Sequence, residues 1–167
     1  MFKQININEL KVNPFNLIGK EWLLISATDG NKCNTMTASW GGLGVIWNKN
    51  VATVYIRPQR YTKHFVDSSE IFTLSFFDES YKKALTYLGR VSGKDEDKIK
   101  NVDFHVINKD QSVYFEEAKM VLVCKKLYHA PIVSEGFEHE ETVNKNYPDR
   151  DFHEMYIGEI VEVLVKE

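Results

Sequence analysis

Three short segments carry side chains whose types and spacing are suited to ligand binding. The first reads NTMTASWGGLG over Asn34–Gly44. Small and hydroxylic residues here lead into an aromatic ring and then into glycines, and glycine lets a planar ligand approach the backbone because it has no Cβ. Successive N–H groups near a turn also bind carbonyl oxygens or an anion. The alternative is a tight barrel corner in which the glycines only relieve crowding, and the spacing alone does not separate the two.

The other two segments suit an anion. RPQRYT over Arg57–Thr62 combines two arginines, a turn fixed by proline and a threonine at an expected helix start. Arginine supplies a charged fork and a helix start supplies free N–H donors, so this segment predicts a phosphate site. SGKDEDK over Ser92–Lys98 reads as a capped helix start in which Lys98 can reach a phosphate. Taken alone, each segment is more typical of solvated surface charge.

Other kinds of site lack their motifs. The five histidines have no HExxH or CxxC context, which argues against a zinc site. Ser39 in ASWGG lacks the preceding glycine of a nucleophile elbow. There is no GxGxxG or Walker loop, so a nicotinamide-binding Rossmann unit is not expected.

Short β-like runs separated by turn residues must position these segments. Asp29-Gly30 predicts a hairpin turn. Pro58 ends the β-like run Val51–Arg57, because proline cannot donate to a central ladder. We expect strands at Trp22–Thr28, Thr35–Trp40, Val51–Arg57, Ile71–Phe77, Met120–Tyr128 and Tyr156–Val165.

Few helices are expected. The strongest is Ser80–Leu88, capped by Asp78 or Ser80 and followed by Gly89 as a left-handed C-terminal residue. Two shorter helices are expected at Thr62–Ser69, with Thr62 as N-cap, and at Lys94–Lys100, and a long surface loop is expected at Glu135–Asp151. Many strands with few helices indicate a β-barrel or sandwich rather than a doubly wound sheet.

Composition limits the class of protein. A chain of 167 residues with 43% hydrophobic residues fits a single domain, residues 1–167, with its own core. A net charge of −3 gives no electrostatic footprint for nucleic acid. Cys33 and Cys124 lie far apart and are expected to be reduced thiols. Neither a signal peptide nor a membrane span is recognisable, so we expect a soluble, cytoplasmic protein.

The segments also match a known family when they are taken in order. The matching stretches are NTMTASWGG at Asn34–Gly42, VYIRPQRYT at Val54–Thr62, FTLSFF at Phe72–Phe77, LGRVSGKDEDK at Leu88–Lys98, EEAKMVLVCKKLY at Glu116–Tyr128 and HEMYIGEIVEV at His153–Val163. Across nearly the whole chain, this order resembles the flavin reductase-like, FMN-binding split-barrel family, particularly its flavoredoxin-type branch. The resemblance implies a mainly β fold, a six-stranded antiparallel split barrel with a few short helices. It also implies a homodimer with one FMN per subunit near the dimer interface.

The resemblance carries flavin contacts onto particular residues. Trp40 would lie close to the flavin ring, and the residues that line the ring and the ribityl chain would be Asn34, Thr35, Met36, Thr37, Ala38, Ser39 and Trp40. The ribityl and phosphate end would contact Arg57, Tyr61 and Thr62, and the phosphate side would be closed by Ser92, Gly93 and Lys98. His153 is the one candidate for a catalytic side chain, and His129 is a weaker candidate near the ring.

The function implied is that of an FMN-dependent oxidoreductase. Such a protein reduces flavin with NADH or NADPH, or passes electrons to a redox partner, and the cofactor holds the chemistry while the protein binds and orients it. Two alternatives stay open. One is an FMN-binding electron carrier or redox sensor without turnover, and the other is a non-catalytic small barrel in which Trp40 and the glycines only pack.

Overall fold

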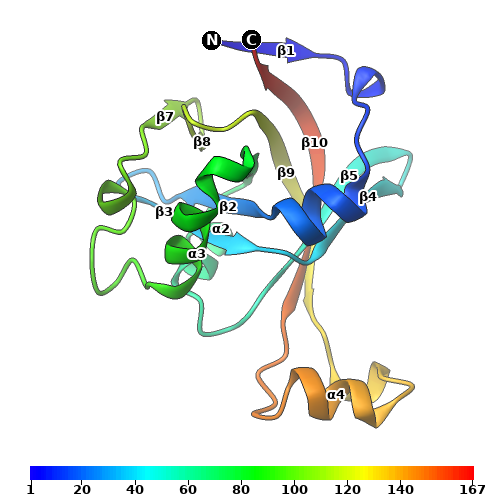
Figure 1. Ribbon diagram of the computed structural model, residues 1–167. Helices are drawn as coiled ribbons and strands as arrows, with labels where there is room; N and C mark the ends of the chain where they lie inside the picture. The colour runs from blue at the N-terminus through cyan, green and yellow to red at the C-terminus, as the bar shows by residue number, and fades with distance from the viewer.

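Antiparallel strands curl around an apolar core in the computed structural model, which describes residues 1–167 (Figure 1). One sheet of eight strands has the order β3-β2-β6-β9-β10-β5-β4, with β1 paired to the end of β10, and β7 and β8 form a separate hairpin. The strands are β1 Phe2–Ile5, β2 Leu23–Thr28, β3 Cys33–Ala38, β4 Gly41–Ile46, β5 Lys49–Ile56, β6 Ile71–Phe76, β7 Val106–Lys109, β8 Ser112–Phe115, β9 Met120–Pro131 and β10 Glu154–Lys166.

Strand β10 is the element that closes and splits the sheet. It pairs with β9 along most of its length, with β5 through Glu154–Glu159, and with β1 through Val163–Lys166. Two irregularities in the β9 register, at Ile157/Gly158 and Ile160/Glu162, bend the strand between these partners. A Cβ on Gly158 would come within 2.6 Å of the Phe72 ring, so the bend requires a glycine here.

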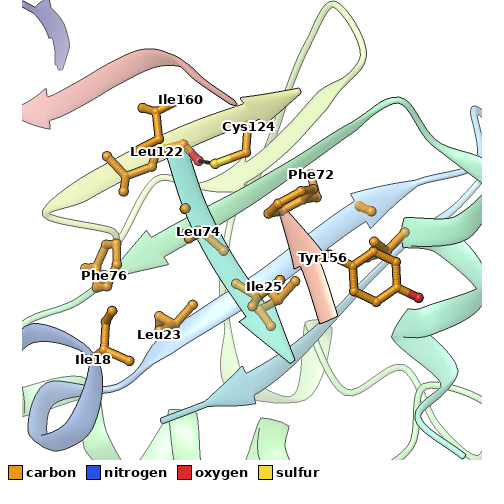
Figure 2. Packing of buried hydrophobic residues seen from close by; sticks show 14 of the residues in the cluster. Ile18, Leu23, Ile25, Phe72, Leu74, Phe76, Leu122, Cys124, Tyr156 and Ile160 are labelled. Atoms are coloured by element: carbon orange, nitrogen blue, oxygen red, sulfur yellow. Dashed lines mark hydrogen bonds between the residues drawn. The ribbon is translucent and has the colours of Figure 1, made fainter. Parts of the chain in front are cut away.

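The core has two parts. The larger fills the inside of the curved sheet and includes Ile25, Phe72, Leu122 and Tyr156 (Figure 2). The smaller lies on the outer face, where Leu24 and Val121 pack against Leu85, Phe104 and Phe115. The β2–β3 hairpin therefore has apolar packing on both faces, and this fixes β3 firmly.

The helices are short and lie at the ends of strands. They are α1 Pro14–Asn16, α2 Tyr61–Ser68, α3 Lys82–Arg90 and α4 Glu140–Asn146, with a π-helical turn at Leu17–Glu21 and 3-10 turns at Ile7–Glu9, Glu79–Tyr81, Lys100–Val102 and Ser134–Gly136. Helix α2 packs on β2 and β3, and α3 packs on β3. Helix α4 lies apart from the barrel, where β9 and β10 extend beyond it (Figure 1). We call residues 132–151 the arm.

All six expected strands are present, and the Asp29-Gly30 turn joins β2 to β3 with Gly30 at φ +91°. β1, β4, β7 and β8 were not expected. β4 is glycine-rich and largely exposed, and β1, β7 and β8 are only four residues long, so none carries a strong β pattern.

Several helix details differ from expectation. The N-cap of α2 is Arg60 and not Thr62, whose hydroxyl is instead buried against Asn34. Neither Asp78 nor Ser80 caps α3 with its side chain.

Gly89 is helical rather than left-handed. A Cβ there would lie 3.1 Å from the Cβ of Thr37, so this glycine allows α3 to pack closely on β3.

Two predicted segments have other structures. Lys94–Lys100 is not a helix but a series of turns, because Lys98 turns inward to bind backbone carbonyls. The expected surface loop Glu135–Asp151 contains α4, which Val143 anchors by its burial. No helix has the length and apolar character that crossing a membrane requires.

Candidate functional site

The start of α2 and the end of α3 meet beside β3. Arg60 precedes α2, and its Nη1 donates to the carbonyl of Gly89 near the end of α3 at 2.8 Å. Thr37 of β3 donates from Oγ1 to the carbonyl of Leu85 at 2.5 Å. These two bonds hold two helix ends and one strand around a common edge.

A small cavity of about 160 Å³ lies at this edge, and we call it the anion cavity. Three cationic side chains line it, those of Arg60, Arg90 and Lys98, and no acidic side chain does. The first N–H groups of α2 belong to Tyr61 and Thr62, whose place at a helix start leaves them without intrahelical acceptors. Its lining is completed by Asn34, Gln59, Tyr61, Thr62, Val91, Ser92 and Gly93. Cations, hydroxyls and free N–H donors around a small volume suit a phosphate group.

Asn34 holds the wall of this cavity together. Its Nδ2 donates to Oγ1 of Thr62 at 3.0 Å, and its side chain is almost fully buried. On the other side it touches Gly93, where an added Cβ would lie 2.3 Å from Oδ1 of Asn34. Gly93 is therefore a glycine because the Asn34 amide occupies the space of a side chain.

Lys98 is buried at the back of the anion cavity. Its Nζ donates to the carbonyls of Leu88 at 2.8 Å and Val91 at 2.9 Å, which satisfies the end of α3. Burial, reinforced by the charge of Arg60, lowers the pKa of Lys98 to about 8. A lysine ammonium has three donors, so one N–H stays available for an anion, whose charge would favour the protonated form.

A second cavity, of about 240 Å³, adjoins the first, and we call it the ring cavity. Arg60 lines both cavities, which makes them two parts of one elongated site. The other residues of the ring cavity are Met36, Thr37, Ala38, Ser39, Trp40, Tyr55, Arg57 and His153. Met36, Ala38, Trp40 and Tyr55 give this cavity apolar and aromatic surface, beside polar and cationic side chains that can fix the orientation of a planar ligand.

His153 is held in one orientation in the ring cavity. Its Nδ1 lies 2.9 Å from the Tyr147 hydroxyl, and its ring centroid lies 5.2 Å from that of Trp40. We assign the Tyr147 hydroxyl as the donor to Nδ1 because it has no other acceptor within the chain, and the neutral imidazole then carries its proton on Nε2. Burial, with the nearby charge of Arg57, lowers the pKa of His153 to about 4, against a smaller opposing effect of Asp151.

Arg57 connects the ring cavity to the arm. Its Nη1 donates to Oδ2 of Asp151 at 2.5 Å, and its Nη2 donates to the carbonyl of Asn146 at 2.9 Å. Its guanidinium lies 5.2 Å from the centre of the Tyr147 ring. Arg57 is thus placed at the ring end of the site and outside the anion cavity, although the sequence suggested the phosphate end.

The structure brings thirteen of the fourteen predicted site residues to these two cavities. The anion cavity collects Asn34, Tyr61, Thr62, Ser92, Gly93 and Lys98, and the ring cavity collects Met36, Thr37, Ala38, Ser39, Trp40, Arg57 and His153. Thr35 is the exception, because its hydroxyl is buried between Ser26 and the carbonyl of Ile25. His129 is exposed, bonds to Glu154 and lines neither cavity.

Five lining residues were not among the predicted contacts: Tyr55, Gln59, Arg60, Arg90 and Val91. Signals for some of them were present in the sequence. Arg60 lies inside RPQRYT, and Tyr55, in β5, lies two residues before Arg57, a spacing that puts both on one side of an extended chain. Arg90 has no such signal, because only the fold brings the end of α3 beside the start of α2.

The comparisons with known proteins identify the family. A model of the flavin reductase-like domain matches residues 16–167. The chain belongs to the flavin reductase-like domain family. Among proteins of curated function, none matches this chain.

Solved structures share the fold of this family member. A flavoredoxin from Methanosarcina acetivorans is 21% identical with a TM-score of 0.69, over 95% of this chain and 75% of that chain. An FMN-binding protein from Thermus thermophilus, crystallised with 1-cyclohex-2-enone, is 20% identical with a TM-score of 0.65, over 85% and 68%. Component B of nitrilotriacetate monooxygenase from Bacillus cereus is 18% identical with a TM-score of 0.69, over 98% and 81%. The expected mainly β split barrel is confirmed, with more strands than the six expected.

Proposed function

We propose that this chain binds FMN and acts as an FMN-dependent oxidoreductase. The observation that carries the proposal is the pairing of the two cavities. A cation-lined cavity suited to a phosphate adjoins a cavity of mixed lining with aromatic walls at Trp40 and Tyr55, and they share Arg60. FMN has a phosphate at one end and a flat ring at the other, so its two ends match the two cavities. The solved relative described as an FMN-binding protein supports this choice of flavin.

Different side chains would bind the phosphate and the ring of FMN. Arg60, Arg90 and the remaining N–H of Lys98 would hold the phosphate, together with the first N–H groups of α2. Trp40 and the strand from Met36 to Ser39 would pack on the ring and ribityl chain. Bound flavin supplies the redox chemistry.

His153 would act as a neutral hydrogen-bond donor in the ring cavity. The bond from Tyr147 keeps its Nδ1 as the acceptor, so Nε2–H is the group free to donate to a carbonyl oxygen or ring nitrogen. Because its pKa is about 4, the imidazole stays neutral at ordinary pH and orients a ligand without adding charge. We therefore propose that His153 orients a ligand and does not give up a proton.

Electrons would come from NADH or NADPH, or pass between the flavin and a redox partner in the cytoplasm. Both cysteines are unpaired, which suits a reducing compartment. A homodimer is also proposed, since the β4–β5 hairpin exposes Val45, Ile46 and Trp47. Light scattering that shows a monomer at micromolar concentration would contradict the dimer. Oxidation of NADH and NADPH in the presence of FMN would separate a turning-over enzyme from a carrier.

The test of the phosphate assignment is a pair of alanine variants on α3. Arg90→Ala removes a cation of the anion cavity, whereas Lys83→Ala removes an exposed cation from the same helix outside it. One charge-assisted contact is worth about 1.5–3 kcal/mol, so Arg90→Ala should weaken FMN about 10- to 100-fold in a fluorescence titration. Lys83→Ala should bind FMN like the wild type. Equal FMN affinity in the two variants would refute the assignment of Arg90 to the phosphate.

A further inference from the structure

A third cavity, of about 390 Å³, lies between the arm and the barrel, and we call it the arm cavity. Trp40 lines both the arm cavity and the ring cavity, so the two adjoin at this indole. The remaining lining residues are Ile132, Val133, Gly136, Phe137, Thr142, Asn146 and Tyr147. A cavity of this size, directly beside the proposed flavin ring, is large enough for a small organic molecule.

The lining of the arm cavity excludes charged ligands. None of its eight residues is ionised at neutral pH, and Trp40, Phe137 and Tyr147 provide aromatic walls. The arm carries six acids, Glu135, Glu138, Glu140, Glu141, Asp149 and Asp151, against two cations, Lys145 and Arg150. Arg57 lies against the Tyr147 ring, but its charge is paired with Asp151. An anion would find no cation in the lining, since the nearby Arg57 is paired with Asp151, and the surplus of acids would repel it, so the pyrophosphate of a pyridine dinucleotide is disfavoured here.

Two polar side chains in the arm cavity can donate a hydrogen bond to a carbonyl oxygen of a ligand. The Thr142 side chain makes no hydrogen bond within the chain, which leaves its hydroxyl free to donate. Asn146 uses its Nδ2 to donate to the backbone carbonyl of Thr142 and keeps a second N–H. Aromatic walls with one or two donors favour a flat, uncharged molecule that carries carbonyl groups.

The arm cavity is built to keep its shape. Arg57 bonds to Asp151 and to the carbonyl of Asn146, so both the end of α4 and the return to β10 are tied to the barrel. Tyr147 is buried, and its ring contacts Phe137 and Phe152 at centroid distances of 6.0 Å and 4.8 Å. The cavity is therefore preformed, which lowers the entropic cost of binding.

We propose that the arm cavity binds an uncharged quinone as the electron acceptor of this protein. The identity of the acceptor rests on the proposed function, because the electrons must come from reduced flavin in the ring cavity. One quinone would take two electrons and two protons to become a hydroquinone, while the reduced flavin returns to its oxidised form. The binding site itself depends only on the residues of the arm cavity.

The experiment uses FMN-loaded protein, reduced by light without oxygen and then mixed with quinone. The probes are 1,4-naphthoquinone and its 2-sulfonate, which keeps the ring and adds one negative charge. We expect flavin reoxidation to saturate with the neutral quinone, at a half-saturating concentration about tenfold or more below that of the sulfonate. A rate that stays linear in both quinones, or equal half-saturation, would overturn the proposal.

A matched pair of variants tests the place of binding. Val133→Glu puts a carboxylate at the wall of the arm cavity, and Val161→Glu makes the same change on β10 away from it, at sites with similar exposure, 51% and 44%. Val133→Glu should raise the half-saturating quinone concentration about tenfold and retain bound FMN, and Val161→Glu should match the wild type. If Val133→Glu behaves like the wild type, or loses its FMN, the arm cavity is not a separate acceptor site.

The failure of the two proposals can be told apart. If the chain binds no FMN, the proposed function fails, and calorimetric titration of the unloaded chain with 1,4-naphthoquinone still examines the arm cavity. Binding that Val133→Glu weakens and Val161→Glu does not would support the cavity as a quinone site. Absence of heat, or equal heat in both variants, would overturn it.

Discussion

At the scale of single residues, the environment of His153 determines what the site can do. Its imidazole is buried beside Trp40, receives a hydrogen bond from Tyr147 and faces the charge of Arg57. Burial and the charge of Arg57 favour the neutral ring, since desolvation and a neighbouring cation each oppose a positive charge. The result is a fixed, uncharged donor where a charged one would be costly.

Removal of the Tyr147 hydroxyl tests this arrangement. In Tyr147→Phe, the neutral imidazole loses the donor to Nδ1, so the pKa of His153 should rise from about 4 by about one pH unit. Nitrogen NMR of the ring should also show both neutral tautomers instead of one. Tyr128→Phe is the control, because Tyr128 is exposed and its hydroxyl makes no hydrogen bond within the chain. An unchanged pKa and a single tautomer in Tyr147→Phe would contradict the account of His153.

The same pKa has a consequence for stability. In the unfolded chain His153 titrates near its ordinary value of 6.5, above its folded value of about 4. Between these values the unfolded chain binds more protons, so the contribution of His153 to stability is complete above pH 6.5 and is lost as the pH falls toward 4. In Tyr147→Phe the folded pKa of His153 should be higher than about 4. The pH range over which stability is lost should therefore be narrower, with its lower end at a higher pH.

Residue positions in the site were predictable in outline but not in detail. The run Asn34–Trp40 was assigned as consecutive contacts, whereas side chains alternate across a strand. Thr35, in the middle of the β2–β3 pairing, is buried against Ser26, whereas Thr37 two residues on lies near the end of the strand and lines the ring cavity. Arg90 was not predictable, because its place depends on the packing of α3 against β3.

At the scale of elements, the bend in β10 holds the split barrel together. A Cβ on Gly158 would meet the Phe72 ring at 2.6 Å and the Cβ of Cys124 at 2.9 Å. Both neighbours are fully buried and have no room to move.

Gly158→Ala should consequently destabilise the fold by about 1–3 kcal/mol in urea unfolding. Gly44→Ala in β4 is the control, because nothing lies within 4 Å of its Cβ position. Its free energy of unfolding should stay within about 0.5 kcal/mol of the wild type. If the two variants are equally stable, close packing at Gly158 does not shape β10.

The secondary structure predicted from the sequence agrees with the structure where the hydrophobic pattern is strong. The six central strands are β-branched or aromatic runs, and a period of two finds them readily. The turns at Lys94–Lys100 were read as a helix because capping residues precede them. The burial of Lys98, a tertiary effect, decides that segment instead.

At the scale of the whole molecule, charge is unevenly distributed. The chain carries a net charge of −3, yet its anion cavity is lined by three cations and no acid. The arm, in contrast, gathers glutamates around an uncharged cavity. We interpret this separation of charged side chains as the basis of ligand selection. The phosphate of the cofactor binds at one end of the site and an uncharged acceptor at the other.

The most direct test of the central claim compares FMN with riboflavin, which has the same ring but no phosphate. Each is titrated into the purified chain, and binding is followed by the visible absorption of the flavin. We predict one FMN bound per chain and at least about a hundredfold weaker binding of riboflavin, because two or more charge-assisted contacts are lost. Equal affinity for both, or binding of neither, would contradict the account.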